Sequence, residues 1–144
     1  MKVRPATSDD FPQWLALWNA NNQGYKDEDV TTKTWARITS DGEPVFALVA
    51  EDAGELVGLL QYIVHPTTGN VLDICYMQDV YVVPERRKQG VARAMIAKLE
   101  ALGKTEKWGR IYWLAENDNK AAQALYKSLG QKMDFSLHIL PLKG

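Results

Sequence analysis

Hydrophobic residues recur along the chain with two periods, and the longer period predicts helices. Spacings of three and four residues place apolar side chains on one face of a helix, as in Phe11, Trp14, Leu15 and Trp18. Four segments have this pattern: residues 11–18, 31–38, 91–102 and 120–129. Cap-type residues at 7–10 precede the first helix, and Gly103 and Gly130 are placed to end the last two.

Continuous apolar runs and alternating patterns predict strands around these helices. They cover residues 2–6, 45–50, 56–64, 71–83, 110–114 and 133–140. A short polar turn at 51–55 joins the second and third strands, which predicts an antiparallel hairpin. The order β-α-α-β-β-β-α-β-α-β predicts an α/β fold with a mixed sheet, helices on both of its faces, and one domain spanning residues 1–144.

Composition and charge narrow the classes of function. Lys and Arg number 17 against 18 Asp and Glu, and the net charge of −1 argues against a surface built to hold nucleic acid or anionic lipid. Cys75 is the single cysteine, which excludes an internal disulfide and a cysteine zinc site, and two distant histidines argue against a His-rich metal site. The polar amino terminus does not resemble a signal peptide, and no apolar run reaches the roughly 20 residues that span a bilayer. We therefore expect a cytoplasmic protein without a bound metal.

A basic loop lies between the fourth predicted strand and the helix that opens at Gly90. Backbone N–H groups at the start of a helix have no intrahelical partner, and the helix dipole favours negative charge there. Small residues at the helix start and the basic side chains of Arg87, Lys88 and Arg93 suit this segment to cradle a pyrophosphate. An ordinary strand-to-helix turn with a solvated loop fits the same residues, and the segment lacks the pattern of a Walker loop or a dinucleotide fingerprint.

The last predicted helix carries a second candidate pair, Asn119 and Tyr126. Seven residues correspond to about 700° of helical rotation, so the two lie on nearly the same face, roughly 10 Å apart. An amide at the helix start and a phenol two turns later suit one extended ligand. The alternative is that Tyr126 is a half-buried core aromatic.

Together these two segments resemble the GCN5-related N-acetyltransferase (GNAT) family. The motifs are Val83-Pro84-x-x-Arg87-x-x-Gly90-x-Ala92 and, after a strand, Asn119-x-x-Ala122-x-x-x-Tyr126-x-x-x-Gly130. The resemblance covers roughly residues 44–130, and segments 76–82 and 112–114 look more loosely like its polyamine and histone-type branch. Two positions depart from the family pattern. Ala92 replaces a usual second glycine, and Gln131 replaces the phenylalanine after Gly130, which allows shortened or rearranged final strands.

The resemblance implies the acyl-CoA N-acyltransferase fold, with a mixed, mostly antiparallel twisted sheet, and acetyl-CoA as co-substrate. In this family the pyrophosphate lies on backbone amides of the basic loop. The pantetheine arm lies beside a bulged strand whose freed amide bonds the thioester carbonyl. Tyr126 would protonate the departing thiolate. The cofactor-binding residues so implied are Val80, Tyr81, Val82, Arg87, Lys88, Gln89, Gly90, Val91, Ala92, Arg93, Asn119 and Ala122.

The amine acceptor arrives protonated and has to lose a proton to a base. Asp79 and Glu116, near the ends of adjacent predicted strands, are the candidates for this base, and each also fits a surface or structural carboxylate. Gln78 stands where polyamine enzymes of the family often have an acid, which weakens a polyamine assignment.

The region of Trp14, Trp18 and Tyr25 walls the acceptor site in this family, although both tryptophans also fit packing under the sheet. We count Trp18, Tyr25 and Gln78 as candidate acceptor-binding residues. The acidic run 27–29 is placed to attract a cationic acceptor, and it equally fits a solvated surface.

These observations predict an N-acetyltransferase that moves the acetyl group of acetyl-CoA to a primary amine by direct attack in a ternary complex. The expected acceptor is a small cationic amine or a lysine-like peptide. The alternative is a catalytically idle acyl-CoA-binding module, which would have no need of the Tyr126 phenol. We expect no nucleic-acid or membrane partner. The apolar final strand is suited to pair between two copies of the chain, which allows a homodimer.

Overall fold

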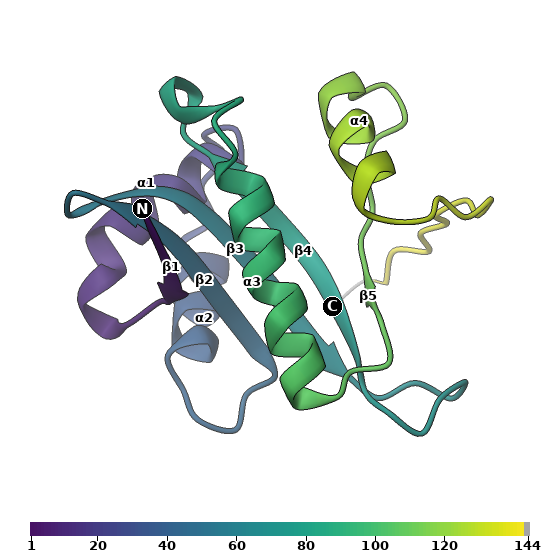
Figure 1. The fold of residues 1–144 in the computed structure, drawn as a ribbon. Coiled ribbons are helices and arrows are strands. Elements are labelled where there is room, and N and C mark those ends of the chain that lie inside the picture. Colours follow the sequence, from purple (N-terminus) through teal and green to yellow (C-terminus); the bar gives the residue numbers. More distant parts are fainter. Residues whose placement is uncertain (143–144) are drawn as a thin grey trace. The chain divides into compact units, whose positions relative to one another are not determined.

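The computed structural model describes residues 1–142, and the chain divides into two compact units, Met1–Leu114 and Ala115–Gly144 (Figure 1). The first unit contains β1 (Lys2–Pro5), α1 (Phe11–Asn21), α2 (Glu28–Ile38), β2 (Val45–Asp52), β3 (Glu55–His65), β4 (Ile74–Val82), α3 (Val91–Glu106) and β5 (Ile111–Tyr112). Short 3₁₀ turns lie at Ser8–Asp10 and Pro84–Arg86. The second unit contains α4 (Lys120–Leu129). That residues 1–144 form a single domain stays a prediction.

The five strands form one sheet in the order β1-β2-β3-β4-β5. The first three pairings are antiparallel and the pairing of β4 with β5 is parallel, which confirms the predicted mixed, mostly antiparallel sheet. Ala53 and Gly54 join β2 to β3 with positive φ angles of 51° and 82°. Two successive positive φ values are typical of the type I′ turn that connects tightly paired strands, and the predicted hairpin is confirmed.

Helices cover both faces of the sheet, as predicted. Gly58 and Leu59 are neighbours on β3 and therefore point to opposite faces. A Cβ atom on Gly58 would lie 2.9 Å from Cγ1 of Val91, so α3 packs closely on that face. Leu59 packs with Trp14 of α1 on the other face, which α2 also covers (Figure 1).

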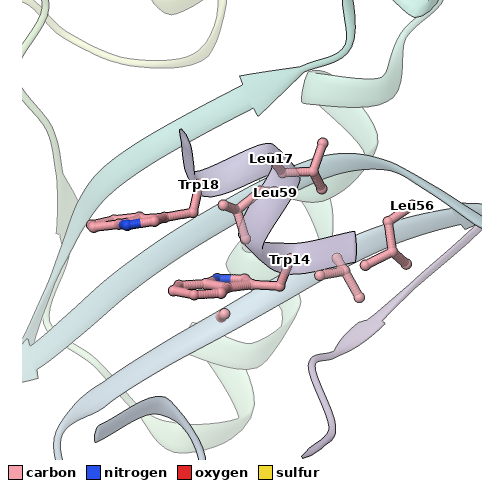
Figure 2. Packing of buried hydrophobic residues seen from close by; sticks show 7 residues of the cluster. Trp14, Leu17, Trp18, Leu56 and Leu59 are labelled. Carbon is pink, nitrogen blue, oxygen red and sulfur yellow. The ribbon is translucent and has the colours of Figure 1, made fainter. Parts of the chain in front are cut away.

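The core between α1 and the sheet is built around two tryptophans (Figure 2). Trp14 is fully buried and Trp18 is 9% exposed, and their rings stack with centroids 5.4 Å apart. Both residues thus pack under the sheet, the second of the two interpretations that their pattern allowed.

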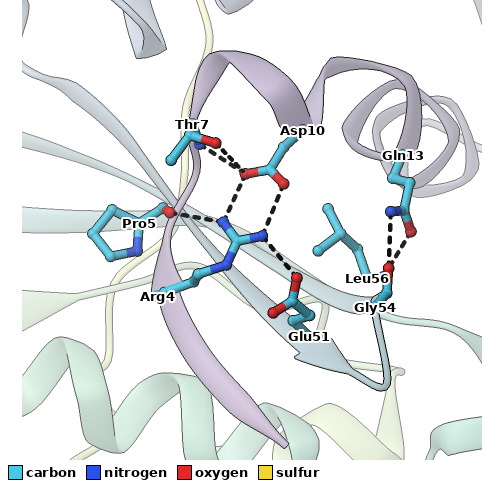
Figure 3. A network of polar contacts seen from close by, with 8 residues as sticks. All are labelled: Arg4, Pro5, Thr7, Asp10, Gln13, Glu51, Gly54 and Leu56. Atoms are coloured by element: carbon cyan, nitrogen blue, oxygen red, sulfur yellow. Dashed lines mark hydrogen bonds and ion pairs between the residues drawn. The ribbon is translucent and has the colours of Figure 1, made fainter.

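An ionic cluster holds the amino-terminal strand to the start of α1 (Figure 3). The Arg4 guanidinium donates to both Asp10 oxygens at 2.7 and 2.9 Å and to Glu51 Oε1 at 3.1 Å. The backbone N–H of Thr7 donates to Asp10 Oδ2 at 2.7 Å. The hydrogen bond from Arg4 outweighs the burial of the carboxyl group and holds the pKa of Asp10 below its ordinary value.

The predicted end of the third helix is wrong. Instead of ending at Gly103, α3 continues to Glu106 and ends where Lys107 adopts a left-handed conformation. A Cβ atom on Gly103 would lie 2.8 Å from Cε3 of Trp108. Gly103 therefore makes room for an aromatic side chain rather than terminating the helix.

The predicted strands at 110–114 and 133–140 also need correction. The first shrinks to β5, residues Ile111–Tyr112, and residues 131–142 contain no strand. A strand needs a partner for its backbone groups, and the described part of the second unit holds a helix and irregular chain only. The alternating residues Phe135, Leu137 and Ile139 are 84, 67 and 76% exposed. A homodimer formed through this segment stays a prediction.

Candidate active site

An extra residue in β4 shapes the centre of the candidate site. On β3, Gln61 and Tyr62 are adjacent, but their partners on β4 are Asp79 and Met77, so Gln78 is bulged out of the ladder. Because of this bulge, Asp79 lies on the same face as Tyr76, which pairs with Ile63. A regular strand would place residues three apart on opposite faces. The bulge therefore brings a carboxylate and an aromatic ring together on the face that α1 covers.

The outer edge of β4 is open beyond its first residues. Within the described part of the first unit, β5 pairs with β4 only at Cys75 and Tyr76. The N–H of Val83 donates to Val57 on β3, so by the alternation of an antiparallel ladder Val80 and Val82 direct their backbone groups to the opposite edge. The Val82 carbonyl there accepts a hydrogen bond from Arg87 Nε at 2.9 Å.

The loop between β4 and α3 is held by its own side chains. The Arg87 guanidinium also lies over the Tyr81 ring, 5.5 Å from its centroid. Arg86 forms an ion pair with Asp52 at 2.8 Å and donates to Gln89 Oε1 at 3.1 Å. The positively charged loop is thereby tied to the end of the hairpin and to β4.

Gly90 opens α3 in a left-handed conformation with φ of 83°, and nothing lies within 4 Å of the position where its Cβ would be. Gly90 has no side chain to cap the helix, so the first N–H groups of α3, on Val91 and Ala92, are available to an acceptor outside the helix. Lys88, which precedes this turn, is exposed and also has positive φ, 61°. This arrangement suits an anionic group at the helix start.

Asp79 lies in the second half of β4, three residues before the strand ends at Val82. Its two oxygens accept hydrogen bonds from Asn21 Nδ2 at 3.1 Å and from Gln61 Nε2 at 2.9 Å. Asn21 and Gln61 were missed in the sequence. Gln61 did leave a signal, as a polar residue inside the apolar run 56–64.

A hollow of about 230 Å³ lies at the carboxyl end of α1, lined by Trp18, Asn22, Tyr25, Asp27, Val30 and Thr31. The Trp18 indole N–H donates to Thr31 Oγ1 at 2.8 Å, and Tyr25 is 73% exposed at the rim. Two candidate acceptor-binding residues, Trp18 and Tyr25, therefore share one hollow. The third, Gln78, is exposed at the β4 bulge.

A larger hollow of about 690 Å³ lies at the other end of α2, beside Ile38, Pro44 and Phe46. It contains none of the predicted site residues. The chemistry-bearing groups of the first unit gather instead around the β4 bulge and the start of α3.

In the second unit, Asn119 caps α4. Its Oδ1 accepts a hydrogen bond from the Ala122 N–H at 3.1 Å. Burial raises the pKa of Tyr126, so its phenol stays protonated at neutral pH. Glu116 is exposed in the segment between β5 and α4, four residues after β5 ends at Tyr112, and its carbonyl accepts a hydrogen bond from Gln123 Nε2.

No group of three or more His, Cys, Asp or Glu residues in the described chain is arranged to hold a metal ion. Cys75 is buried, and burial raises the pKa of its thiol to about 12. Because a nucleophilic cysteine needs an accessible thiolate, Cys75 fits the role of a small core residue instead. None of the helices among residues 1–142 is long and apolar enough to cross a membrane.

Comparison with known proteins agrees with this geometry. The sequence model of the acetyltransferase (GNAT) family matches residues 8–131. The D-amino-acid N-acetyltransferase HPA3 of Saccharomyces cerevisiae is 28% identical over 142 residues, which cover 94% of this chain and 88% of that protein.

Two solved structures have a similar fold. AAC(6')-Iy in complex with the bisubstrate analog CoA-S-monomethyl-acetylneamine has a TM-score of 0.85 at 16% identity, covering 99% of this chain and 97% of that one. Ribosomal-protein-alanine N-acetyltransferase from Brucella melitensis has a TM-score of 0.82 at 20% identity, covering 99% of this chain and 100% of that one. The predictions of this fold and of an N-acetyltransferase are confirmed. The chain belongs to the GNAT family of acetyltransferases.

Proposed function

We propose that this protein moves the acetyl group of acetyl-CoA to the primary amine of a small cationic acceptor, by direct attack in a ternary complex. The observation that carries the proposal is a run of outward-facing backbone donors in two parts, at Val80 and Val82 on the free edge of β4 and at the open start of α3 after Gly90. Such a run suits a ligand with an amide-bearing arm and a pyrophosphate.

The residues of this run fit the parts of acetyl-CoA. The outward N–H groups at the start of α3 are donors for the pyrophosphate, and Lys88 and Arg93 add positive charge. The free N–H groups of β4 are donors for the pantetheine arm and the thioester carbonyl. Asn119 and Ala122 are assigned to the cofactor because they belong to the family motif. The Oδ1 atom of Asn119 caps α4, so its Nδ2 group is the donor we assign to the pantetheine arm.

The chemistry requires stabilisation of a developing negative charge and three proton transfers, two from the nitrogen and one to the departing thiolate. When an amine attacks the thioester, negative charge develops on the carbonyl oxygen, and a fixed backbone N–H stabilises it. The departing thiolate needs a proton, and we assign Tyr126 as the donor because its phenol carries that proton at neutral pH. The attacking ammonium gives up one proton to Asp79 or Glu116, directly or through water, and its nitrogen gives up a second to the Tyr126 phenoxide or to solvent as the amide forms.

Charge and size support a small cationic acceptor. Asp79 lies on the face of the sheet that α1 covers, where its carboxylate contacts Asn21. Asp27 caps α2 and lines the hollow, and Glu28 and Asp29 belong to the first turn of that helix. The hollow beside Trp18, about 230 Å³, is smaller than the roughly 300–1,000 Å³ of sites for drug-sized ligands. The relatives' names point to amines of several kinds, a D-amino acid, an aminoglycoside and a protein alanine.

Release of free thiol from acetyl-CoA across an amine panel tests this function. The panel contains a diamine, an aminoglycoside, D- and L-amino acids and a peptide with an amino-terminal alanine, with a no-amine control. We expect the highest kcat/KM with the diamine or the aminoglycoside. Acetyl-CoA should also raise the Tm, because it binds the folded state.

Two results contradict the proposal. A raised Tm without thiol release from any amine would identify an idle acyl-CoA-binding module. No change in Tm at millimolar acetyl-CoA would remove the proposed cofactor site itself.

A further inference from the structure

A buried glutamine connects the core to the candidate site. Gln61 of β3 is 4% exposed, and both ends of its side-chain amide are bonded. Its Oε1 accepts a hydrogen bond from the Trp14 indole N–H at 2.9 Å, and its Nε2 donates to Asp79 Oδ2 at 2.9 Å. A leucine in its place would fill the same strand position without either bond.

The direction of this amide is forced by chemistry. An indole N–H can only donate, so the amide oxygen has to face Trp14 and the NH₂ group has to face Asp79. Trp14 cannot turn away, because it is fully buried and stacked on Trp18. The orientation of Gln61 is therefore set by the core and passed on to the carboxylate.

Asn21, the last residue of α1, holds the other oxygen of the carboxylate at 3.1 Å. An ionised carboxylate offers about four acceptor positions, so two remain after these hydrogen bonds. The β4 bulge places Tyr76 on the same face, and the ring of Tyr76 stacks on that of Tyr112 with centroids 5.0 Å apart. A carboxylate with open acceptor positions beside aromatic rings suits an alkylammonium group.

We infer that Gln61 is a positioning residue: it holds the Asp79 carboxylate in the direction that binds a cationic group of the acceptor. This inference rests on the proposed function and deepens it: Asp79 holds a second ammonium group of the acceptor, so the attacking ammonium gives its proton to Glu116 or to water, and acceptors with two positive charges are favoured. Gln61 itself is buried, so it acts through Asp79 rather than on the substrate.

The test compares two acceptors of equal length, a diamine and the amino alcohol in which a hydroxyl replaces the second amino group. Gln61→Met keeps the volume of the side chain and removes both of its hydrogen bonds. We expect Kd and KM for the diamine to rise about tenfold, the factor expected for loss of one hydrogen bond to a charged group. The KM values for the amino alcohol and for acetyl-CoA should stay within twofold of the wild type.

Asn21→Ala provides a second variant, at a half-buried position outside the core, in case Gln61→Met does not fold. It should weaken diamine binding in the same direction by a smaller factor. Gln13→Ala is the matched control, because Gln13 also reaches from α1 to the sheet, with its amide bonded to Gly54 and Leu56 at the far end of the helix (Figure 3). Gln13→Ala should leave both acceptors unchanged.

Calorimetric binding of the diamine in the presence of CoA keeps this inference separate from the proposed function. A wild-type protein that binds the diamine but releases no thiol contradicts the proposed function alone. The inference is overturned if folded Gln61→Met or Asn21→Ala binds the diamine as the wild type does. It is equally overturned if the diamine and the amino alcohol weaken by the same factor.

Discussion

The helices α3 and α4 each carry one of the two motifs, yet they are built in different ways. In α3 the apolar side chains of Val91, Met95, Ile96 and Leu99 are buried. In α4 and in the rest of residues 115–142 no residue is fully buried, and Tyr126 is half-buried. Tertiary packing of an apolar face thus supports α3 within the first unit, whereas within the second unit the Asn119 cap supports the start of α4.

This difference suggests a division of labour under the proposed function. The first unit offers fixed backbone donors, which suit binding of the cofactor. The second unit offers the Tyr126 phenol, whose contribution is to the chemical step. Substitutions in the two helices should therefore change different kinetic constants.

The largest expected effect comes from Tyr126→Phe, which keeps the ring and removes the proton donor. We expect the single-turnover rate to fall about 10²-fold, within the usual range for general acid catalysis, with the Kd for acetyl-CoA nearly unchanged. Since burial raises the pKa of Tyr126 above its ordinary value of 10.0, the wild-type rate should show no loss of this acid up to pH 9.

Tyr62→Phe is the matched control for that measurement. Tyr62 is 8% exposed, and burial raises the pKa of its phenol to about 12, yet it lies outside the candidate site. Its single-turnover rate should equal that of the wild type. Equal rates for Tyr126→Phe and the wild type would exclude Tyr126 as the acid.

Gly90→Ala tests the other side of the comparison. A side chain at φ of 83° strains the backbone by about 1–2 kcal/mol, although nothing nearby would clash with it. Relief of this strain should displace the first N–H groups of α3, so we expect the Kd for acetyl-CoA to rise about tenfold. The single-turnover rate at saturating acetyl-CoA should change little.

Gly42→Ala is the control that separates the effect of backbone strain on stability from a loss of acetyl-CoA binding. Gly42 has φ of 84° and likewise nothing within 4 Å of its Cβ position. Both variants should lower the Tm to a similar extent, but only Gly90→Ala should weaken acetyl-CoA binding. Equal Kd values in the two variants would show that the start of α3 does not hold the cofactor.

The two helices also show what the sequence could predict. Apolar periodicity located both helices, and the cap residues Asn119 and Gly130 lie at the ends of α4. The prediction of a helix end at Gly103 failed, because a glycine that makes room for Trp108 looks the same in the sequence as one that ends a helix. The prediction of a strand at 133–140 also failed, because alternation marks residues fit for a strand but does not supply a partner strand.

The candidate site was predictable where motifs carry it and missed where pairing creates it. Arg87, Gly90 and Asn119 stand at fixed spacings and could be singled out. The role of Asn21 and Gln61 depends on the register of β3 against β4 and on the bulge at Gln78. That register brings Gln61 to Asp79, and the packing of α1 on the sheet brings Asn21 to the same carboxylate from 58 positions away. Neither contact can be read from a local sequence pattern.

The ionic cluster of the first unit predicts a smaller effect, on stability. Asp10→Asn keeps the shape of the side chain but removes the charge that Arg4 contacts at 2.7 Å. We expect the free energy of unfolding at pH 7 to fall by about 1–3 kcal/mol, the range for a hydrogen bond between charged groups. Urea titration of both proteins measures this difference.

The pH dependence of that difference follows from the lowered pKa of Asp10. A carboxyl group whose folded pKa lies below its unfolded value stabilises the protein above the unfolded pKa, here near 3.8, and loses that contribution as the pH falls through the folded pKa. The difference in the free energy of unfolding between the wild type and Asp10→Asn should therefore be at its full size at pH 6 and become smaller below pH 4. Asp9→Asn, next to it and exposed, should show no such difference.

The smallest expected effect concerns the acceptor and the negative charge that the first unit presents to it. The residues Asp27, Glu28, Asp29 and Asp79 would concentrate negative potential where the amine enters, while the basic loop faces the cofactor. Raising the salt concentration from 0.05 to 0.5 M should lower kcat/KM for the diamine by about threefold, because salt screens attraction between exposed charges. The value of kcat/KM for the amino alcohol of the same length, which has one positive charge fewer, should fall less.

Replacing Glu28 by Gln and Asp29 by Asn together should reduce this salt dependence without changing the KM for acetyl-CoA, because these side chains lie on α2 and not on the cofactor loop. A diamine rate that does not respond to salt, or a preference for the amino alcohol, would contradict the electrostatic account while leaving acetyl transfer itself intact.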